Sequence, residues 1–274
     1  MPDVNGVGFV AYYYPEDVEG TPKTGVAYQP ISQHTEFNPE SVSEPVVVPK
    51  SGSKDPVGGY KGTHKAKVNL KGDIGSDFIT FLKSYAYNNT SIAIVLTDGT
   101  YYYTLPGSKI IGGTISAKSA ADGSPSAGKY DIDLECFDVT MTQPGGSTFA
   151  AVSGDAVNWD AISITMGGSP VSWRSFEFNF KNDFDDDFDS SGNRNALRLG
   201  TRSHDFSITE TSPMSISDFT TVKNATAKTV VVTMTGLTIT ATNMQYDSVK
   251  DPIPNSKIIT REIKSEAGGV LTFA

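Results

Sequence analysis

The feature that most constrains the fold is a two-residue alternation of apolar and polar side chains that recurs along the chain. In the segment HKAKVNLKG, Ala66, Val68 and Leu70 alternate with lysine and asparagine. Because successive side chains of a β-strand point to opposite faces of a sheet, this pattern predicts a strand with one buried face. The segments SIAIVLTDGTYYYTL and TVVVTMTGLTITAT each predict a hairpin, with turns at Asp98-Gly99 and at Gly236.

The remaining predicted elements are also mostly strands. They are Ile110–Ala117, Tyr130–Met141, Ala161–Met166, Ser172–Phe180 and Lys257–Ile263. One helix is predicted at Ser76–Tyr85, where Ser76 or Asp77 would cap the first turn and Phe78, Phe81 and Leu82 share a face. With 26 glycines, 15 prolines and no long helical pattern among 274 residues, the chain is predicted to be all-β.

Four landmarks recur in the same order in both halves of the chain. They are Glu36-Phe37-Asn38 with Glu177-Phe178-Asn179, Gly62-Thr63 with Gly200-Thr201, Ser76-Asp77-Phe78 with Ser217-Asp218-Phe219, and Gly99 with Gly236. The separation between the two partners is nearly the same for all four landmarks. This constancy predicts an internal duplication, with two tandem β-sandwich or barrel units at residues 1–150 and 151–274 and one short helix in each. The segment Thr142–Asp160, rich in Gly, Pro and Ser, is expected to connect the units.

Each half carries a long polar segment at the same place. The first, NPESVSEPVVVPKSGSKDPVGGYK, lies between Phe37 and Gly62, and the second, NFKNDFDDDFDSSGNRNALRL, lies between Phe178 and Gly200. Loops of this length are uncommon within compact domains and usually have a function. Phenylalanines in an acidic loop have no reason to face water, so we expect those of the second segment to pack on something outside it, such as another subunit.

No residue pattern predicts catalysis, a metal or a cofactor. The three histidines lie in no zinc-ligand spacing, the single cysteine has no partner, and no G-x-S-x-G segment occurs. Aspartates alternate from Asp183 to Asp189 in a way that would suit calcium, but the glycine and glutamate of an EF-hand loop are missing in both frames. We therefore expect a protein without enzymatic activity, metal or cofactor.

The charge balance argues against binding to nucleic acids or membranes. The net charge is −9 and the pI about 4.8, so contact with phosphates would gain nothing from counterion release. Acidic lipid surfaces are disfavoured for the same reason. The N-terminal segment lacks the basic and apolar regions of a signal peptide, and no apolar run is long enough to span a membrane.

Stretches from both halves resemble one family of viral proteins. In the second half they are EFNFKND…NALRLGTRSHDFSITE and SDFTTV…KTVVVTMTGLTITATN, and in the first half EFNPE…GYKGTHKAKVNLKGDI and SIAIVLTDG. The arrangement of these stretches resembles the major tail tube protein of tailed bacterial or archaeal viruses. The unusually acidic loop and the short tail GGVLTFA depart from the family pattern.

The resemblance implies a structural virion protein that is catalytically inert. Sheets of neighbouring copies would join edge to edge, and a chain with two units would form trimeric, pseudo-hexameric rings that stack into the tail tube, assembled in the host cytoplasm. Viral DNA would pass through the lumen during ejection without specific binding. The expected partners are further copies of the chain and tail terminator, baseplate or tip, tape-measure or sheath proteins. The loop residues expected to contact neighbouring subunits or rings are Glu44, Val46, Val47, Val48, Asp183, Phe184, Asp185, Asp187, Phe188, Asp189 and Arg194.

Two other functions and one structural question stay open. The tyrosine runs Tyr12–Tyr14 and Tyr101–Tyr103 would suit a secreted or surface β-sandwich that binds carbohydrate or mediates adhesion, although no signal peptide accompanies them. A metal-dependent hydrolase built on the aspartates would lack a histidine or nucleophile partner. The lysines near Ala66 leave open which strand face would line a lumen.

Overall fold

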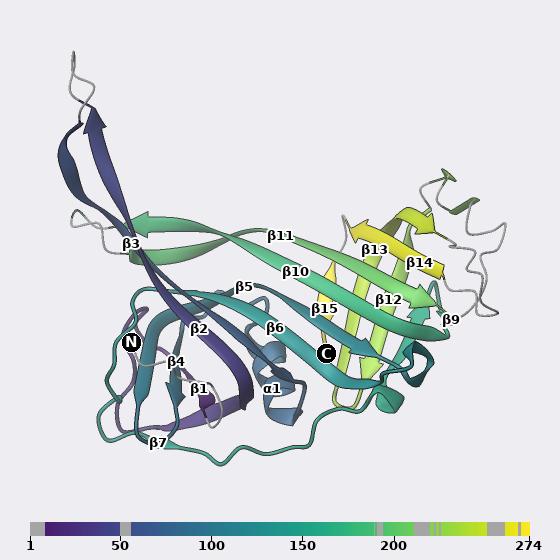
Figure 1. Cartoon of the computed structure of the whole chain (residues 1–274), viewed down its shortest axis with the longest axis horizontal. Coiled ribbons are helices and arrows are strands. Elements are labelled where there is room, and N and C mark those ends of the chain that lie inside the picture. The colour runs from purple at the N-terminus through teal and green to yellow at the C-terminus, as the bar shows by residue number, and fades with distance from the viewer. Residues whose placement is uncertain are drawn as a thin grey trace.

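The computed structural model confirms the all-β class. It describes residues 9–49, 56–188, 190, 194–210, 220–221, 223–224, 226–250, 261–267 and 270–274. Strands account for most of these residues, and their hydrogen-bonded path runs through both halves of the chain. Figure 1 shows a first half with its strands wrapped around α1, a second half beside it, and two long strands, β10 and β11, that extend from the second half across the first.

The strands of the first half form a closed path. They are β1 (Val10–Pro15), β2 (Ala27–Pro49), β3 (Pro56–Asp73), β4 (Ile92–Thr97), β5 (Tyr102–Lys118) and β6 (Ser126–Cys136). They pair in the order β4-β1-β2-β3-β6-β5, and a further β4–β5 pairing closes the barrel. Closure leaves no free edge at β1 and β4, which are buried in their own half.

The second half repeats this order without closing it. Its strands are β8 (Ser163–Met166), β9 (Ser169–Pro170), β10 (Trp173–Phe188), β11 (Arg194–Glu210), β12 (Lys228–Met234), β13 (Leu237–Lys250), β14 (Arg261–Ala267) and β15 (Leu271–Phe273). The order β10-β11-β14-β13-β12-β8 matches β2-β3-β6-β5-β4-β1, and among the described strands no β8–β10 pair closes it. The connecting segment holds β7 (Thr148–Phe149), which pairs with β2.

Four shifts in strand register occur at corresponding places in the two halves, and those on β2 and β10 agree to within one residue. A β-bulge bends a strand locally and is a specific feature of a fold, so repeated positions are informative. In the first half the shifts lie at His34/Glu36, Glu44/Val46, Ile92/Ile94 and Ile110/Gly112. In the second half they lie at Trp173/Ser175, Asn182/Phe184, Lys228/Val230 and Tyr246/Ser248. The separation along the chain is nearly the same for all four corresponding pairs.

These shifts correct one of the sequence landmarks. Aligning the shift at His34/Glu36 with the shift at Trp173/Ser175 places Phe37 of β2 at the position of Phe176 in β10. The Glu-Phe-Asn match, which pairs Phe37 with Phe178, is therefore out of register by two residues. Both of these positions still point to the same face, because side chains of a strand alternate.

The other landmarks differ in how well the structure supports them. The two hairpin glycines agree, because Gly99 and Gly236 both lie in turns with φ of +88° and +80°. The landmark at Ser217-Asp218-Phe219 lies outside the described residues. Thr220, Thr221 and Lys223, just after it, are helical.

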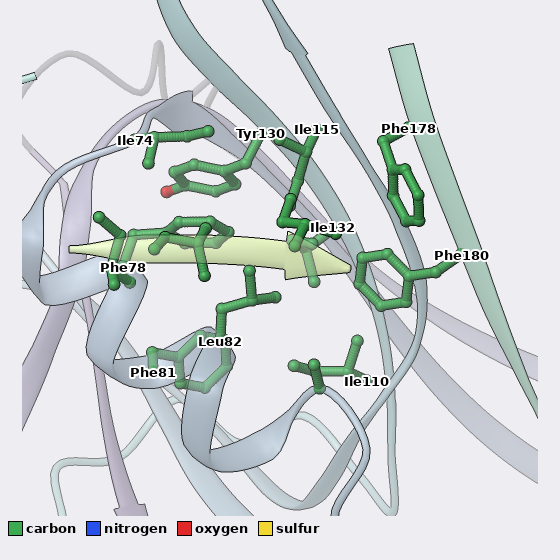
Figure 2. Packing of buried hydrophobic residues seen from close by; sticks show 14 of the residues in the cluster. Ile74, Phe78, Phe81, Leu82, Ile110, Ile115, Tyr130, Ile132, Phe178 and Phe180 are labelled. Atoms are coloured by element: carbon green, nitrogen blue, oxygen red, sulfur yellow. The ribbon is translucent and has the colours of Figure 1, made fainter. Parts of the chain in front are cut away.

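Helix α1 (Ser76–Tyr85) has the predicted bounds and the predicted buried face. Phe78, Phe81 and Leu82 are completely buried. Phe78 stacks on Tyr130 of β6 with ring centroids 3.8 Å apart. In Figure 2 the side chains of α1 point toward the sheet, and Phe178 and Phe180 of β10 enter the same core. One hydrophobic cluster therefore continues from the first half into the second.

The predicted cap of α1 is wrong. Gly75 is the N-cap residue, and it has no side chain to accept a hydrogen bond. Asp77 instead accepts hydrogen bonds from the Ser153 backbone N–H and hydroxyl, at 2.6 and 2.8 Å. Its carboxylate thus ties the connecting segment to the helix, which explains why a capping residue type occurs one position inside the first turn.

The two long polar segments are not loops, which is a second correction. The first is part of a hairpin in which β2 continues to Pro49 and β3 begins at Pro56. The second is part of a hairpin in which β10 continues to Phe188 and β11 begins at Arg194. We call these the first and second hairpin. Polar residues are tolerated in these strands because the backbone pairs across each hairpin. The first hairpin projects from the barrel, whereas β10 and β11 run across the first half (Figure 1).

Candidate functional site

The candidate site is the pair of sheet edges and the hairpins next to them. Strand β2 pairs with β3 from His34 to Pro49, and no described strand lies along its other edge there. Strand β13 pairs with β14 from Met244 to Lys250, and its other edge has no described partner beyond Met244. An unpaired row of backbone N–H and C=O groups is a template for another strand.

The same kind of edge is already paired inside the chain. Strand β5 of the first half pairs antiparallel with β10 of the second half, from Gly112 opposite Lys181 to Lys118 opposite Ser175. We call this pairing the internal seam. A Cβ atom on Gly112 would lie 2.9 Å from the Phe180 carbonyl oxygen, so glycine permits the close approach. The Thr114 hydroxyl bonds to Asn179 Oδ1 across the seam at 2.6 Å.

One face of the sheet that crosses this seam is polar, and its lysines are neutralised by carboxylates. The sheet lysine pairs are Lys67–Glu135 at 3.1 Å, Lys71–Asp131 at 3.2 Å, Lys129–Asp73 at 2.6 Å and Lys181–Asp183 at 2.7 Å. Asn69 donates to Asp131 and Asp133 at 2.5 and 2.7 Å, and Asn179 donates to Glu177 and Asp205 at 3.0 and 2.9 Å. Lys67 and Lys71 of β3 therefore do not make this face basic.

The second hairpin is fixed to the first half by Arg194. Its side chain is fully buried and lies 2.8 Å from Glu135 and 2.9 Å from Asp186. It also donates to the Cys136 carbonyl oxygen at 2.9 Å. Asp186 in turn lies 2.7 Å from Lys65. A buried guanidinium needs such partners because the free energy of removing its charge from water is high.

A second contact is centred on Lys109 of β5. Its side chain is 2% exposed and lies 2.7 Å from Glu19. It also donates to the Leu197 carbonyl oxygen of β11, and Leu197 N–H donates to Glu19 at 3.2 Å. Asn182 of β10 donates to the carbonyl oxygens of Ala86 and Ile110 at 2.7 and 2.8 Å. Most of these partners belong to the first half, so the second hairpin lies across it.

The phenylalanines of the acidic segment pack outside the segment, as expected, but on their own chain. Lys109 Nζ lies 6.0 Å from the centre of the Phe184 ring, and Lys65 Nζ lies 5.9 Å from that of Phe188. Asp183 is exposed. Its pKa is held below the usual value mainly by its hydrogen bond with Lys181, and in second place by the hydrogen bond from Thr201. Asp187 lies 3.5 Å from Arg198. In the part of the chain that the structure describes, no three His, Cys, Asp or Glu side chains cluster as a metal would require.

The other predicted contact residues are placed only in part. Glu44, Val46, Val47 and Val48 lie in the distal part of β2, Asp185 is exposed, and Asp189 lies outside the described residues. The structure brings Phe184, Phe188 and Arg194 together on the first half of the same chain. Contact of these residues with neighbouring subunits or rings stays a prediction.

Sequence reasoning missed Lys109, Glu19 and Asn182. A lysine inside the apolar run KIIGG was the available signal, because a charge at a buried strand position needs a partner. The tyrosine runs are divided between two environments. Tyr13 lies in the main core against Phe81 and Tyr85, while Tyr12 contacts Phe149 of the connecting segment. None of the described helices is long and apolar enough to cross a membrane.

Comparison with known proteins gives little further information. No family model matches the chain, and no curated protein matches it. Among solved structures, a chain from the virion of a native gene transfer agent particle aligns with a TM-score of 0.36 and 15% identity. The alignment covers 43% of this chain and 99% of that chain. A TM-score this low does not establish a common fold or function.

Proposed function

We propose that this chain is a structural virion protein whose copies join through their sheet edges into rings of three, which stack into a tail tube for viral DNA. The observation that carries the proposal is the internal seam. It joins two halves of matching strand order, and the corresponding edges of β2 and β13 have no partner among the described strands. We infer that the halves arose by duplication, since four register shifts recur in equivalent places.

The repeated register shifts relate the strands of the internal seam to the two free edges. Strand β5 corresponds to β13, and aligning their shifts places Gly112 at the position of Ser248. Strand β10 corresponds to β2, and counting from the shifts at Trp173/Ser175 and His34/Glu36 places Lys181 at the position of Val42. The free edges of β13 and β2 are therefore the counterparts of the two edges that already pair within the chain.

The internal seam then supplies a register for the contact between copies. Gly112 opposite Lys181 becomes Ser248 opposite Val42 of the next copy. The same register sets Lys250 opposite Glu40, which are residues of opposite charge. Strand pairing of this kind uses unlike edges and therefore joins copies head to tail.

A ring of three copies is what the resemblance to tail tube proteins implies for a chain with two similar halves. Head-to-tail contacts close into a ring when the rotation per contact divides a full turn, and two similar halves per copy give six similar units in a trimer. A closed ring removes both free sheet edges, which would otherwise invite aggregation. Tail terminator, baseplate or tip, tape-measure or sheath proteins would then contact the ends or outside of the stacked rings.

The polar face suits the wall of a DNA channel. Its described lysines are bound by carboxylates, while Asp133, Glu177 and Asp205 contact asparagine amides that carry no charge. A wall whose described cations are neutralised in this way offers no strong sites to DNA phosphates there and would let the polymer move. We therefore place this face toward the lumen.

Electron microscopy of the concentrated full chain tests the proposal. We expect rings or tubes with an axial channel, and a ring mass three times that of the chain by light scattering. A chain that stays monomeric at all concentrations and binds glycans on an array would overturn the proposal in favour of a carbohydrate-binding or adhesion protein.

A further inference from the structure

The second hairpin and the first hairpin have equivalent places in their halves, yet only one of them has a described surface to lie on. The second hairpin leaves β10 and β11 and covers the half that precedes it across the internal seam. The first hairpin leaves β2 and β3 and projects from the body (Figure 1). Within one chain, the second hairpin lies on the half that is joined to it through the internal seam, which is the first half. If the contact between copies repeats the internal seam, the first hairpin is joined in the same way to the second half of a neighbouring copy.

The surface that would receive the first hairpin follows from the register. Lys109 and Ile110 of β5 correspond to Gln245 and Tyr246 of β13, because both strands shift register against their neighbour directly afterwards. Glu135 of β6, which binds Arg194, corresponds to Glu266 of β14 in the same alignment. The receiving surface is therefore formed by adjacent positions of β13 and β14.

The surface on the second half is more exposed than its counterpart on the first half, as expected if no hairpin covers it. The side chain of Lys109 is 2% exposed beneath the second hairpin. Its counterpart Gln245 is exposed. On the hairpins, Phe184 lies near Lys109, and its counterpart by the register shift at Glu44/Val46 is Val46.

We infer that the first hairpin of one copy lies across β13 and β14 of the next copy in the same ring, with Val46 over Gln245. The inference rests on the proposed function, since it requires contact between copies through the sheet edges. It adds that the hairpin is a clamp within a ring and not a link to the ring above or below. The occupant of the β13–β14 surface is thus a second copy of this chain.

Crosslinking through cysteines tests this arrangement. We would combine Val46→Cys with Gln245→Cys, assemble the variant, and add a short bis-maleimide. The native Cys136 interferes little, since it is buried and burial raises its pKa to about 12. We expect covalent dimers and trimers on a denaturing gel, with no larger product even from stacked tubes. The pair Lys65→Cys with Phe188→Cys should crosslink within one chain and serves as the positive control.

Different failures of this experiment have different meanings. Rings that form without crosslinked products overturn the clamp and leave the proposed function intact, whereas a wild-type chain that forms no rings overturns both. Crosslinked products larger than trimers would show that the hairpin reaches another ring, which also overturns the clamp. If the double variant does not fold, the single variant Gln245→Cys tests the inference through the rate at which maleimide labels its cysteine. We expect maleimide to react at least tenfold more slowly in rings than in the dilute chain, and equal rates would contradict the clamp.

Discussion

At the scale of single residues, the stability of the second hairpin depends most on Arg194. Replacing it by methionine would leave Glu135 and Asp186 close together without their shared cation. Breaking a buried ion pair from one side typically lowers the free energy of unfolding by about 3 kcal/mol. We expect a loss of this size for Arg194→Met, measured by urea denaturation.

A matched control lies further along the same strand. Arg198 is 73% exposed and lies 3.5 Å from Asp187, so Arg198→Met should change the free energy of unfolding by less than about 0.5 kcal/mol. Equal effects of the two substitutions would show that the buried cluster does not hold the hairpin.

His204 makes the stability of the folded chain depend on pH. The ring is buried beside Phe178, and burial lowers its pKa from 6.5, while Asp205 opposes the shift. A histidine whose pKa is lower in the folded state stabilises the fold above pH 6.5, and this contribution is lost as the pH falls toward the folded value.

We therefore expect His204→Phe to weaken the acid dependence. The urea midpoint of the wild type should fall more than that of the variant between pH 7.5 and pH 5, because phenylalanine keeps a ring against Phe178 and cannot take up a proton. If the urea midpoints of the wild type and the variant fall by the same amount over this range, His204 is ruled out as the cause.

The sequence predicts which residues are buried better than it predicts what they bind. Alternation placed His204 in phase with Phe206, and both are buried. Alternation also implies that alternate residues of the acidic segment share a face, but only the fold shows that this face meets Lys65 and Lys109. Partners from distant parts of the chain leave no local pattern, so the buried ion pairs could not be predicted.

At the scale of elements, the internal seam depends on small residues in β5. A side chain at Gly112 would meet the backbone of β10, since a Cβ atom there lies 2.9 Å from the Phe180 oxygen. Gly112→Val should therefore push the strands apart and lower the free energy of unfolding by about 1–3 kcal/mol. Gly145→Ala is the control, because nothing lies within 4 Å of its added Cβ and the change should be within about 0.5 kcal/mol. Equal denaturation curves for Gly112→Val and the wild type would contradict close packing at the seam.

The sequence predicts the short local elements correctly but not the long hairpins, and the reason is physical. The predictions of helix α1 and of the turns at Gly99 and Gly236 are confirmed because these elements depend on local periodicity and on turn residues. The sequence predicts loops for the two long segments because both are rich in polar residues, and the first also contains prolines, which are rare inside strands. Their strand structure comes from pairing across the hairpin and, for β10, from the first half beneath it.

At the scale of the whole molecule, the register of the proposed contact between copies can be measured. Ser248→Cys with Val42→Cys, and Val249→Cys with Ser41→Cys, are adjacent cross-strand pairs in the expected register. Antiparallel pairs alternate between hydrogen-bonded and non-hydrogen-bonded sites, and the second kind brings Cα atoms to about 4.5 Å, which suits a disulfide. One of the two variants should therefore oxidise into a covalent trimer.

The control for this experiment shifts one cysteine along the strand. Ser248→Cys with Asn38→Cys lies about 13 Å out of register along an extended strand, and should run as single chains on a non-reducing gel at every stage of oxidation. If the shifted pair closes as well as the matched pairs, the internal seam is no template for the external one. If the matched pairs alone close, the sheet that joins the two halves of one chain also joins one chain to the next. The ring would then be a repeat of a contact that each copy already contains.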